Sequence, residues 1–187
     1  EQTYSILKSF EKIYTVLPDK IPQVRAVPRS KAGQLIAWYS HYADSNNPVE
    51  FGINVSKFLN ADILQDTVDR SIKLGWFSKN SSPEHIMIHE FGHHIDFQLS
   101  KLVSNQFSDD VFREMEKANP EKYSVSEVGK LTGGYAREYY KRQRSNVETF
   151  AELFAEAYGE TPREIANDFR VAFERKAKEV LKNAGHT

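Results

Sequence analysis

The sequence feature that most constrains this chain is the run His89-Glu90-Phe91-Gly92-His93, which lies inside a stretch that reads as a helix. Residues four apart lie one above the other on the same helical face. The two His side chains can therefore share one metal ion, and the Glu between them can act on whatever else that metal holds. Such a site needs a continuous helix here and a further ligand from elsewhere in the chain.

The residues around this motif indicate that its helix is long. Residues 81–84, Ser-Ser-Pro-Glu, form a strong helix start, with Ser as the cap and Pro at the first helical position. Apolar residues recur at helical spacing up to Leu99, and nothing breaks the helix before about Lys101. Glycine in the middle of a helix costs about 1 kcal/mol relative to alanine. We therefore expect another segment to pack closely against the helix at Gly92.

The composition indicates a folded domain. The 187 residues are 40% hydrophobic and 27% charged, which allows a sizeable core. Because 25 basic and 26 acidic residues nearly cancel, nothing suggests a nucleic acid or a membrane surface as a partner. No apolar run approaches the roughly 18 residues of a membrane span, so we expect a soluble protein without membrane insertion. The chain has no Cys, so any tightly held transition metal must be bound by His and carboxylate side chains.

The first 80 residues contain the candidate strands. Prolines at positions 18, 22 and 28 indicate an extended connection after a first helix. Two runs rich in strand-forming residues flank the turn sequence Ser-Asn-Asn-Pro at residues 45–48, so we expect them to pair as a hairpin. The predicted elements of this region are a helix over residues 4–17, strands over residues 35–42 and 51–55, and a helix over residues 60–74.

The rest of the chain reads as helices. Glycines at positions 133 and 134 end one predicted helix, Ser145 caps the next, and Pro162 opens the last. A strand-containing lobe followed by helices predicts an α+β fold, with the motif helix between the two parts. We expect one domain over residues 1–187, divided into a front lobe at 1–80 and helices at 81–187. The predicted helices after the motif helix cover residues 109–118, 124–131, 145–158 and 162–183.

A catalytic zinc site needs a third protein ligand and an open position for water. When that ligand follows closely in the chain, a Gly three residues after the second His usually breaks the helix. Asp96 occupies this position, so the helix should continue and the third ligand should come from a later helix. We expect Asp96 to hold the free ring nitrogen of one of the two His residues instead.

The later helix offers a stripe of acidic residues beside an apolar face. Glu148, Glu152 and Glu156 are spaced i, i+4 and i+8, so they lie on one face. A carboxylate beside the apolar face points inward and needs a partner such as a metal or a His. Glu148, in the first turn after the cap Ser145, is our first choice as the third ligand. Glu152 is its rival one turn on, and we expect Glu156 to be an exposed charge.

Taken together, these segments resemble the catalytic domain of anthrax lethal factor. They are also similar to the related Pro-Pro endopeptidases and to metallopeptidase-like domains of phage and mobile-element proteins. The resemblance covers mainly residues 82 to about 168 and implies a zincin-like fold with a gluzincin-type zinc site. It is carried by the run from His89 to Asp96, by Tyr-Ala-Arg at residues 135–137 and by Glu-Thr-Phe-Ala-Glu-Leu-Phe at residues 148–154.

The resemblance also implies roles for individual residues. In that family both His residues of the motif and the Glu of an E-x-F-A-E pattern bind zinc, which here implies His89, His93 and Glu148. The Glu of the motif, here Glu90, activates a water molecule. The E-x-F-A-E pattern occurs twice in overlap, so Glu152 begins a second copy.

A tyrosine ahead of the ligand Glu stabilises the oxyanion in that family, at an offset of seven residues. This offset falls on Lys141 for Glu148 and not on a tyrosine. Tyr135 matches by its local sequence but requires an insertion, whereas Tyr140 matches better by distance. We rank Tyr135 first.

The resemblance implies a zinc-dependent endopeptidase acting on a protein or peptide, which would lie extended along an exposed strand edge. The strand at residues 51–55 is the candidate edge. A non-catalytic or structural module of a phage or mobile-element protein is the alternative, and a toxin with one host target would differ only in specificity. Peptide deformylase shares the motif but normally uses Cys as its third ligand. Because this chain has no Cys, peptide deformylase is disfavoured. Oligomeric state and compartment stay open, since a secreted and a phage-associated protein are both compatible with the chain.

Three further His residues are not expected to bind the metal. His94 points about a hundred degrees away from His93, so we expect it to be solvated or beside the site without binding the metal. His85 lies near the helix start and is not expected to be a ligand. His41, among mixed aromatic residues, is interpreted as structural.

Overall fold

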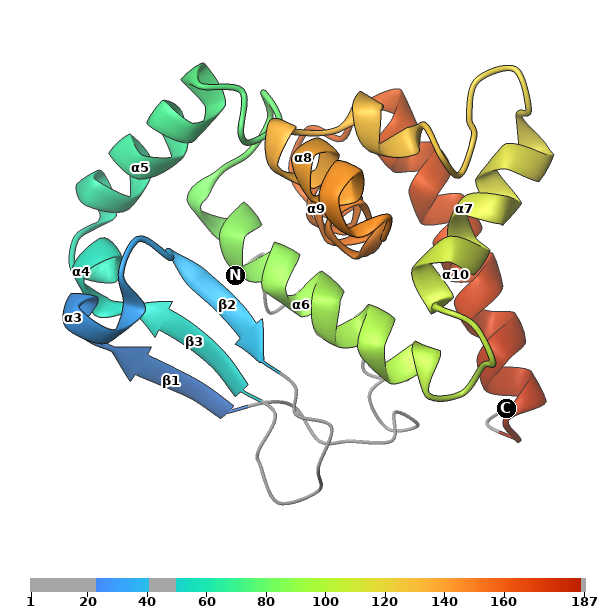
Figure 1. The fold of residues 1–187 in the computed structure, drawn as a ribbon, viewed down its shortest axis with the longest axis horizontal. Helices are drawn as coiled ribbons and strands as arrows, with labels where there is room; N and C mark the ends of the chain where they lie inside the picture. The colour runs from blue at the N-terminus through green and yellow to red at the C-terminus, as the bar shows by residue number, and fades with distance from the viewer. Residues whose placement is uncertain (1–22, 41–49, 186–187) are drawn as a thin grey trace.

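A computed structural model describes residues 23–40 and 50–185 of the chain (Figure 1). In this part, a small sheet precedes a series of helices, which confirms the predicted α+β class. The strands are β1 (Gln23–Val27), β2 (Ala37–Ser40) and β3 (Glu50–Asn54). The helices are α3 (Arg29–Ala32), α4 (Val55–Phe58), α5 (Ala61–Lys73), α6 (Pro83–Ser100), α7 (Phe107–Ala118), the 3-10 turn η1 (Val128–Leu131), α8 (Gly134–Gln143), α9 (Val147–Ala157) and α10 (Glu164–Asn183).

The sheet has the strand order β1-β3-β2. β3 pairs in parallel with β1 and antiparallel with β2, with Ala37 opposite Ile53. The expected hairpin pairing of the second and third strands is therefore confirmed. The expectation that residues 51–55 form the free edge is wrong, because β1 covers the other side of β3. Among the described strands, β2 lies at the edge of the sheet nearest to α6 (Figure 1).

Strand β1 lies in a segment that we interpreted as a Pro-marked connection. Four of its five residues are exposed and only Val27 is buried. The exposed and buried residues of β1 therefore do not alternate as they do in a strand with one buried face. The predicted helix at 60–74 is confirmed as α5, whose first turn is capped by the Asn60 side chain accepting from the Asp62 N–H at 2.7 Å. The predicted helix at 4–17, the turn at 45–48 and His41 lie outside the described residues.

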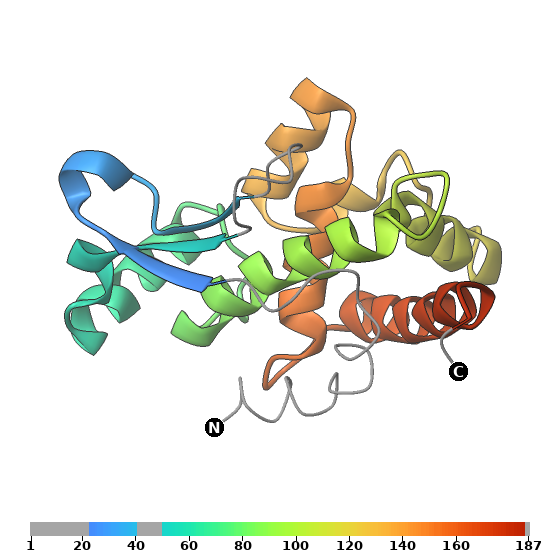
Figure 2. The ribbon, with the colours of Figure 1, turned by 90° about the horizontal axis from the view of Figure 1, so that it is seen from below.

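Helix α6 is confirmed with the predicted start and end. Ser82 is its extended N-cap residue, Pro83 is its first helical residue and Lys101 is its C-cap. The helix separates the two parts of the fold, with the sheet on one side and α7, α9 and α10 on the other (Figures 1 and 2). Eleven of its residues are buried, as this central position requires. None of the described helices combines the length and the hydrophobicity that a membrane span requires.

The expected close approach at Gly92 is confirmed, and the neighbouring segment is α9. A Cβ atom on Gly92 would lie 3.0 Å from Ala151 Cα and 3.2 Å from Phe154 Cβ. Such distances are tighter than ordinary van der Waals contacts, so a side chain at this position would push α9 away. Because α6 carries the motif and α9 carries the acidic stripe, this contact sets the spacing between the two sets of polar side chains.

A cluster of buried aromatic rings anchors α9 from its other side. The rings of Phe150 and Phe169 meet edge to face with centroids 5.1 Å apart, and Phe154 meets Phe173 in the same way at 5.4 Å. All four side chains are fully buried. The apolar face of α9 is thus fixed against α10, while its acidic face turns toward α6.

Several predicted details of the C-terminal part are wrong. The helix at 124–131 is only the 3-10 turn η1, and α8 fills a segment that had no predicted helix. Ser145 is not the cap of α9, because the helix starts one residue later with Asn146 at the N-cap position. The Asn146 amide donates to Asp109 and to the carbonyl of Val125, so its side chain serves packing rather than capping.

Glu156 was expected to be exposed, but it is 2% exposed. Its two carboxylate oxygens accept from the Arg163 guanidinium, at 2.5 Å for Nε and 2.6 Å for Nη2. This two-pronged pair supplies the partner that a buried carboxylate needs. Glu156 therefore joins the end of α9 to the start of α10 and takes no part in the acidic stripe that faces α6.

Replacing Gly92 by Val is expected to destabilise the protein by about 3 kcal/mol, because the new side chain overpacks the contact between α6 and α9. Urea unfolding of the metal-free protein measures this change. The same residue type at the exposed α10 position 178, introduced as Lys178→Val, is the matched control and should cost less than about 1 kcal/mol. Equal effects at the two positions would contradict the close packing.

Candidate metal centre

The structure brings His89 and His93 of α6 together with Glu148 of α9. His89 Nε2 lies 3.2 Å from His93 Nε2 and 3.2 Å from Glu148 Oε2. His93 Nε2 lies 3.3 Å from the same carboxylate oxygen. The three potential ligand atoms thus form a nearly equilateral triangle, and these residues make up one of the two groups that could hold a metal ion in the described part of the chain.

The triangle has the size that a zinc ion requires. Three ligands held tetrahedrally at about 2.0 Å from zinc lie about 3.3 Å from one another. Two imidazole nitrogens and one carboxylate oxygen form a donor set that suits zinc, and other divalent transition metals also accept it. The residues present therefore fit a metal ion with three protein ligands and a fourth position open.

The charges at this centre reinforce each other. Burial raises the pKa of Glu148, but hydrogen bonds with His89 and His93 outweigh this and lower it to about 2. Burial lowers the pKa of His89, but hydrogen bonds with Glu148 and Glu152 raise it to about 10. In the metal-free protein, both ring nitrogens of His89 are therefore protonated at neutral pH, and the ring is positively charged. A buried site that holds a positive charge so firmly is suited to a cation.

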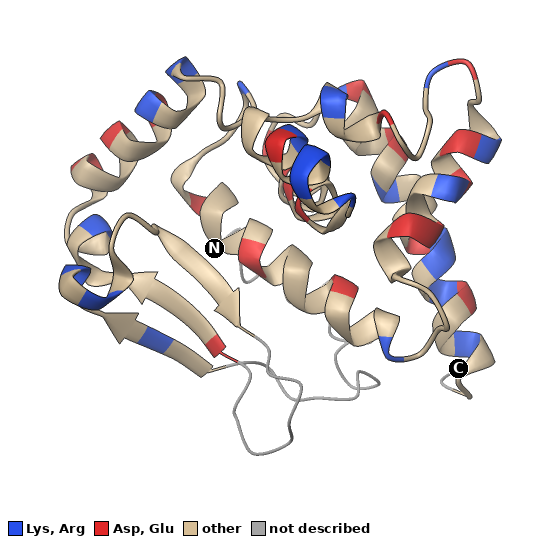
Figure 3. Cartoon of the chain, viewed as in Figure 1, with Lys and Arg blue, Asp and Glu red and all other residues tan. Residues whose placement is uncertain are grey.

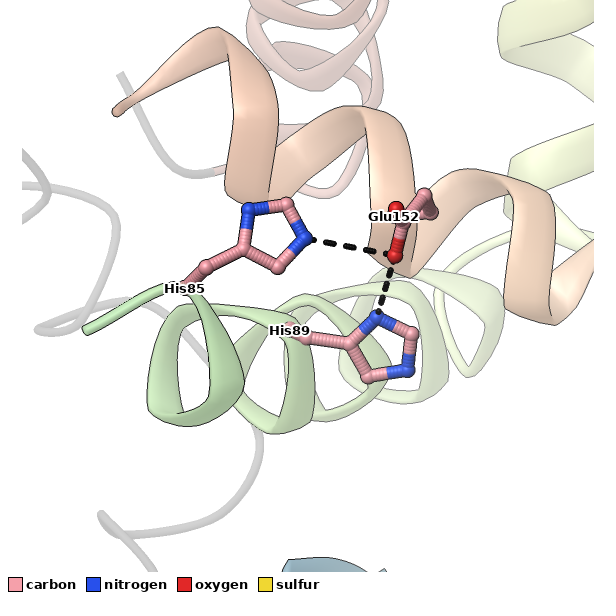
Figure 4. A group of neighbouring side chains, drawn as sticks. All are labelled: His85, His89 and Glu152. Carbon is pink, nitrogen blue, oxygen red and sulfur yellow. Dashed lines mark hydrogen bonds and ion pairs between the residues drawn. The ribbon is translucent and has the colours of Figure 1, made fainter. Parts of the chain in front are cut away.

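Glu152 contacts the opposite ring nitrogen of His89 (Figure 4). Its Oε2 atom lies 3.5 Å from His89 Nδ1 and 3.2 Å from His85 Nε2, and its Oε1 atom accepts the N–H of Ser78 at 3.1 Å. Burial raises its pKa, but the two His residues hold it well below its usual range. A carboxylate on the second nitrogen of a metal-binding His fixes the tautomer and orientation of the ring.

His85, His89 and Glu152 are the second group that could hold a metal ion. His89 belongs to both groups but turns a different nitrogen to each. Glu148 lines a cavity between β2 and the first half of α6, and Glu152 does not. Of the two carboxylates, only Glu148 therefore borders the cavity.

Glu90 faces the edge strand across that cavity. Its side chain is nearly buried, and its carboxylate accepts the backbone N–H of Tyr39 in β2. Burial raises the pKa of Glu90, although the charges of His89 and His93 act against this rise. A carboxylate with a raised pKa beside a metal site can accept a proton and release it again.

The cavity has a volume of about 300 Å³ and lies between β2 and the first half of α6. Tyr135, from the first turn of α8, lines it together with Glu90 and Glu148. Burial and then the charges of these two carboxylates raise the pKa of Tyr135 to about 12. Tyr140 does not line the cavity, and its ring instead lies beside Arg144, 6.0 Å from the guanidinium.

Two glycines explain how Tyr135 reaches the cavity. The N–H groups of Gly134 and Tyr135 donate to the carbonyls of Gly75 and Trp76, at 2.7 Å and 3.4 Å. A Cβ atom on Gly133 would lie 2.5 Å from the Trp76 carbonyl oxygen, and one on Gly134 would lie 2.6 Å from that of Gly75. We interpreted these glycines as the end of a helix, but they begin α8 and let the chain pass close to the segment before α6.

Asp96 does not hold a His nitrogen, so that expectation is wrong. Its carboxylate accepts from the Ser108 N–H and from the Gln106 amide, both at 2.7 Å. Because Ser108 lies in the first turn of α7, Asp96 caps that helix from a neighbouring one. Burial raises the pKa of Asp96 to about 6, although both hydrogen bonds oppose the rise.

His94 is neither solvated nor beside the metal centre. It is fully buried under the sheet, with Nδ1 3.2 Å from the Tyr39 hydroxyl and its ring 6.1 Å from that of Phe51. His85 is a partner of Glu152, which sequence reasoning missed. The signal was present, because His85, His89 and His93 recur every four residues on one helical face.

No protein-family model, curated protein or solved structure matches this chain.

Zinc binding is expected to release about one proton at pH 7, because the raised pKa of His89 keeps both ring nitrogens protonated in the metal-free protein. The apparent affinity should then rise by about tenfold per pH unit between pH 7 and pH 9, below the pKa of about 10. Calorimetry in buffers of different ionisation enthalpy measures the proton count. An affinity that does not change over this range would contradict the described pairing.

Proposed function

We propose that this protein is a zinc-dependent endopeptidase of the gluzincin type. The observation that carries the proposal is the triangle of His89, His93 and Glu148, which lies beside the buried Glu90 at a cavity bordered by an edge strand. The resemblance to the lethal factor catalytic domain, based on the motif and the Glu-rich helix, points to the same chemistry. His89, His93 and Glu148 would hold the zinc.

A zinc ion bound here would polarise a water molecule and lower its pKa toward about 7. Glu90 takes the proton of the attacking water and later delivers it to the leaving amine. The raised pKa of Glu90 supports this exchange, since a carboxylate with an ordinary pKa returns a proton poorly near neutral pH.

Tyr135 donates a hydrogen bond to the oxyanion that forms on the substrate carbonyl. Its pKa of about 12 keeps the hydroxyl protonated at neutral pH, so the donor is always present. The position of Tyr135 on the cavity with Glu148 and Glu90 supports this role. Tyr140, the alternative by sequence distance, does not line the cavity.

The substrate is an extended peptide paired with β2. The carbonyl of Ile36 accepts the N–H of Asn54 at 2.9 Å, which makes them a hydrogen-bonded pair of the antiparallel ladder. Because such pairs alternate, the backbone groups of Ala37 and Tyr39 point away from β3 and toward the cavity. The bond from Tyr39 N–H to Glu90 agrees with this alternation. A peptide added at Ala37 gains main-chain hydrogen bonds regardless of its sequence.

β2 carries no charged residue (Figure 3). Apolar residues dominate the cavity wall around it. The acidic groups on the cavity wall are Glu90 and Glu148, both in the proposed machinery. Substrate side chains next to the scissile bond must leave water to enter this cavity. Apolar substrate side chains therefore lose the least free energy of hydration there.

Replacing Glu90 by Gln is expected to lower the cleavage rate of a peptide library by at least about 100-fold, because the amide cannot accept the proton of water. The zinc content, measured by atomic absorption, should stay at one ion per chain. Glu84→Gln, on an exposed position of the same helix, is the matched control and should cleave normally. Cleavage by Glu90→Gln at the wild-type rate would contradict the proposal. Zinc binding without any cleavage by the wild type would instead favour a non-catalytic module.

Replacing Tyr135 by Phe is expected to lower kcat by about 10- to 1,000-fold, with KM and zinc affinity little changed, because the lost hydrogen bond forms only with the oxyanion. Steady-state kinetics on a peptide identified from the library measures both constants. Tyr140→Phe is the matched control and should retain kcat. A loss of kcat in Tyr140→Phe alone would assign the role to Tyr140 instead.

A further inference from the structure

Helix α6 carries a third His on the face that bears the two proposed zinc ligands, and this His is buried. His85 lies in the first helical turn and is 4% exposed. Its ring packs beside that of Phe77, with centroids 6.3 Å apart. The proposed reaction so far gives His85 no part, although it would be costly to bury an imidazole at this position without a function or a partner.

His85, His89 and His93 alternate with the two carboxylates of α9. Glu152 contacts both His85 and His89. Glu148 contacts both His89 and His93. The contact from Glu152 to His85 is 3.2 Å, shorter than its 3.5 Å contact to His89. Both contacts use the same carboxylate oxygen (Figure 4). The position of that oxygen therefore depends on His85.

We propose that His85 is a positioning residue, which holds the Glu152 carboxylate against Nδ1 of His89 so that Nε2 of His89 faces the metal. This inference rests on the proposed zinc centre at His89, His93 and Glu148. The opposite oxygen of Glu152 is fixed by the Ser78 N–H at 3.1 Å, so the carboxylate is held at both ends. A carboxylate fixed in this way leaves the His89 ring with one orientation.

The chemistry of imidazole explains why His85 and Glu152 orient a ligand and do not bind a second ion. A neutral imidazole has one nitrogen with a proton and one without. When Nε2 of His89 binds the metal, Nδ1 must carry the proton. This Nδ1–H group then donates a hydrogen bond to the Glu152 carboxylate. A second metal ion at Nδ1 would require His89 to lose both protons.

The experiment measures zinc affinity by competition with a chelator for wild type, His85→Asn and His85→Gln. The amide of Gln reaches about as far as Nε2 of His, whereas that of Asn is one bond shorter. His85→Asn should weaken zinc binding by about 10- to 100-fold, the range for residues that orient metal ligands. His85→Gln should restore it to within about threefold of wild type. Cobalt substituted for zinc should show an altered absorption spectrum only in His85→Asn.

A double substitution tests whether His85 acts through Glu152. If it does, His85→Asn combined with Glu152→Gln should bind zinc no more weakly than Glu152→Gln alone, because the contact is already lost. Losses that multiply in the double variant would overturn the proposal. So would a second zinc ion bound by wild type and lost in His85→Asn, since His85 would then be a ligand.

The outcomes separate this inference from the proposed function. If wild type binds zinc and His85→Asn binds it equally well, only the positioning role falls. If wild type binds no zinc, the proposed function falls and the positioning role with it. Circular dichroism of the metal-free variants checks folding, and His85→Leu, which fills the space without a donor, takes the place of His85→Asn if the latter is unfolded.

Discussion

The contact between α6 and α9 at Gly92 is the constraint on which the rest of the structure depends. Because Gly92 has no side chain, the backbone of Ala151 can approach to a distance at which three His residues and two Glu residues interleave. The aromatic cluster behind α9 prevents the helix from rotating its acidic face away. A wider separation would place each carboxylate beyond contact with its imidazole partners, and both candidate metal groups would be lost together.

This contact also has an electrostatic cost. Glu148 and Glu152 are nearly buried, and a buried carboxylate is tolerated only with partners that offset its lost hydration. The His residues of α6 provide these partners, which is why the pKa of Glu148 falls while that of His89 rises. Such a pair adds little net stability compared with an apolar contact. Its presence at the bottom of a cavity is better explained by function, since a cation can replace the proton on His89.

The sequence predicts the parts of this site that are local. Two His residues four apart need only one helix, so the motif and the limits of α6 could be read from capping residues and apolar spacing. The choice between Glu148 and Glu152 depends on the register between two helices, which no local pattern encodes. β1 was missed because its residues are exposed on both faces, and α8 because its outer face is polar. Asp96 and Glu156 were misassigned because their partners, Ser108 and Arg163, come from neighbouring helices.

The central claim is that His89, His93 and Glu148 bind one zinc ion. The most direct test is an anomalous difference map from a crystal of the zinc-loaded protein. The account predicts one strong peak, about 2.0 to 2.2 Å from Nε2 of both His residues and from a carboxylate oxygen of Glu148. A peak between His85, Nδ1 of His89 and Glu152, or no peak at full zinc loading, would contradict it.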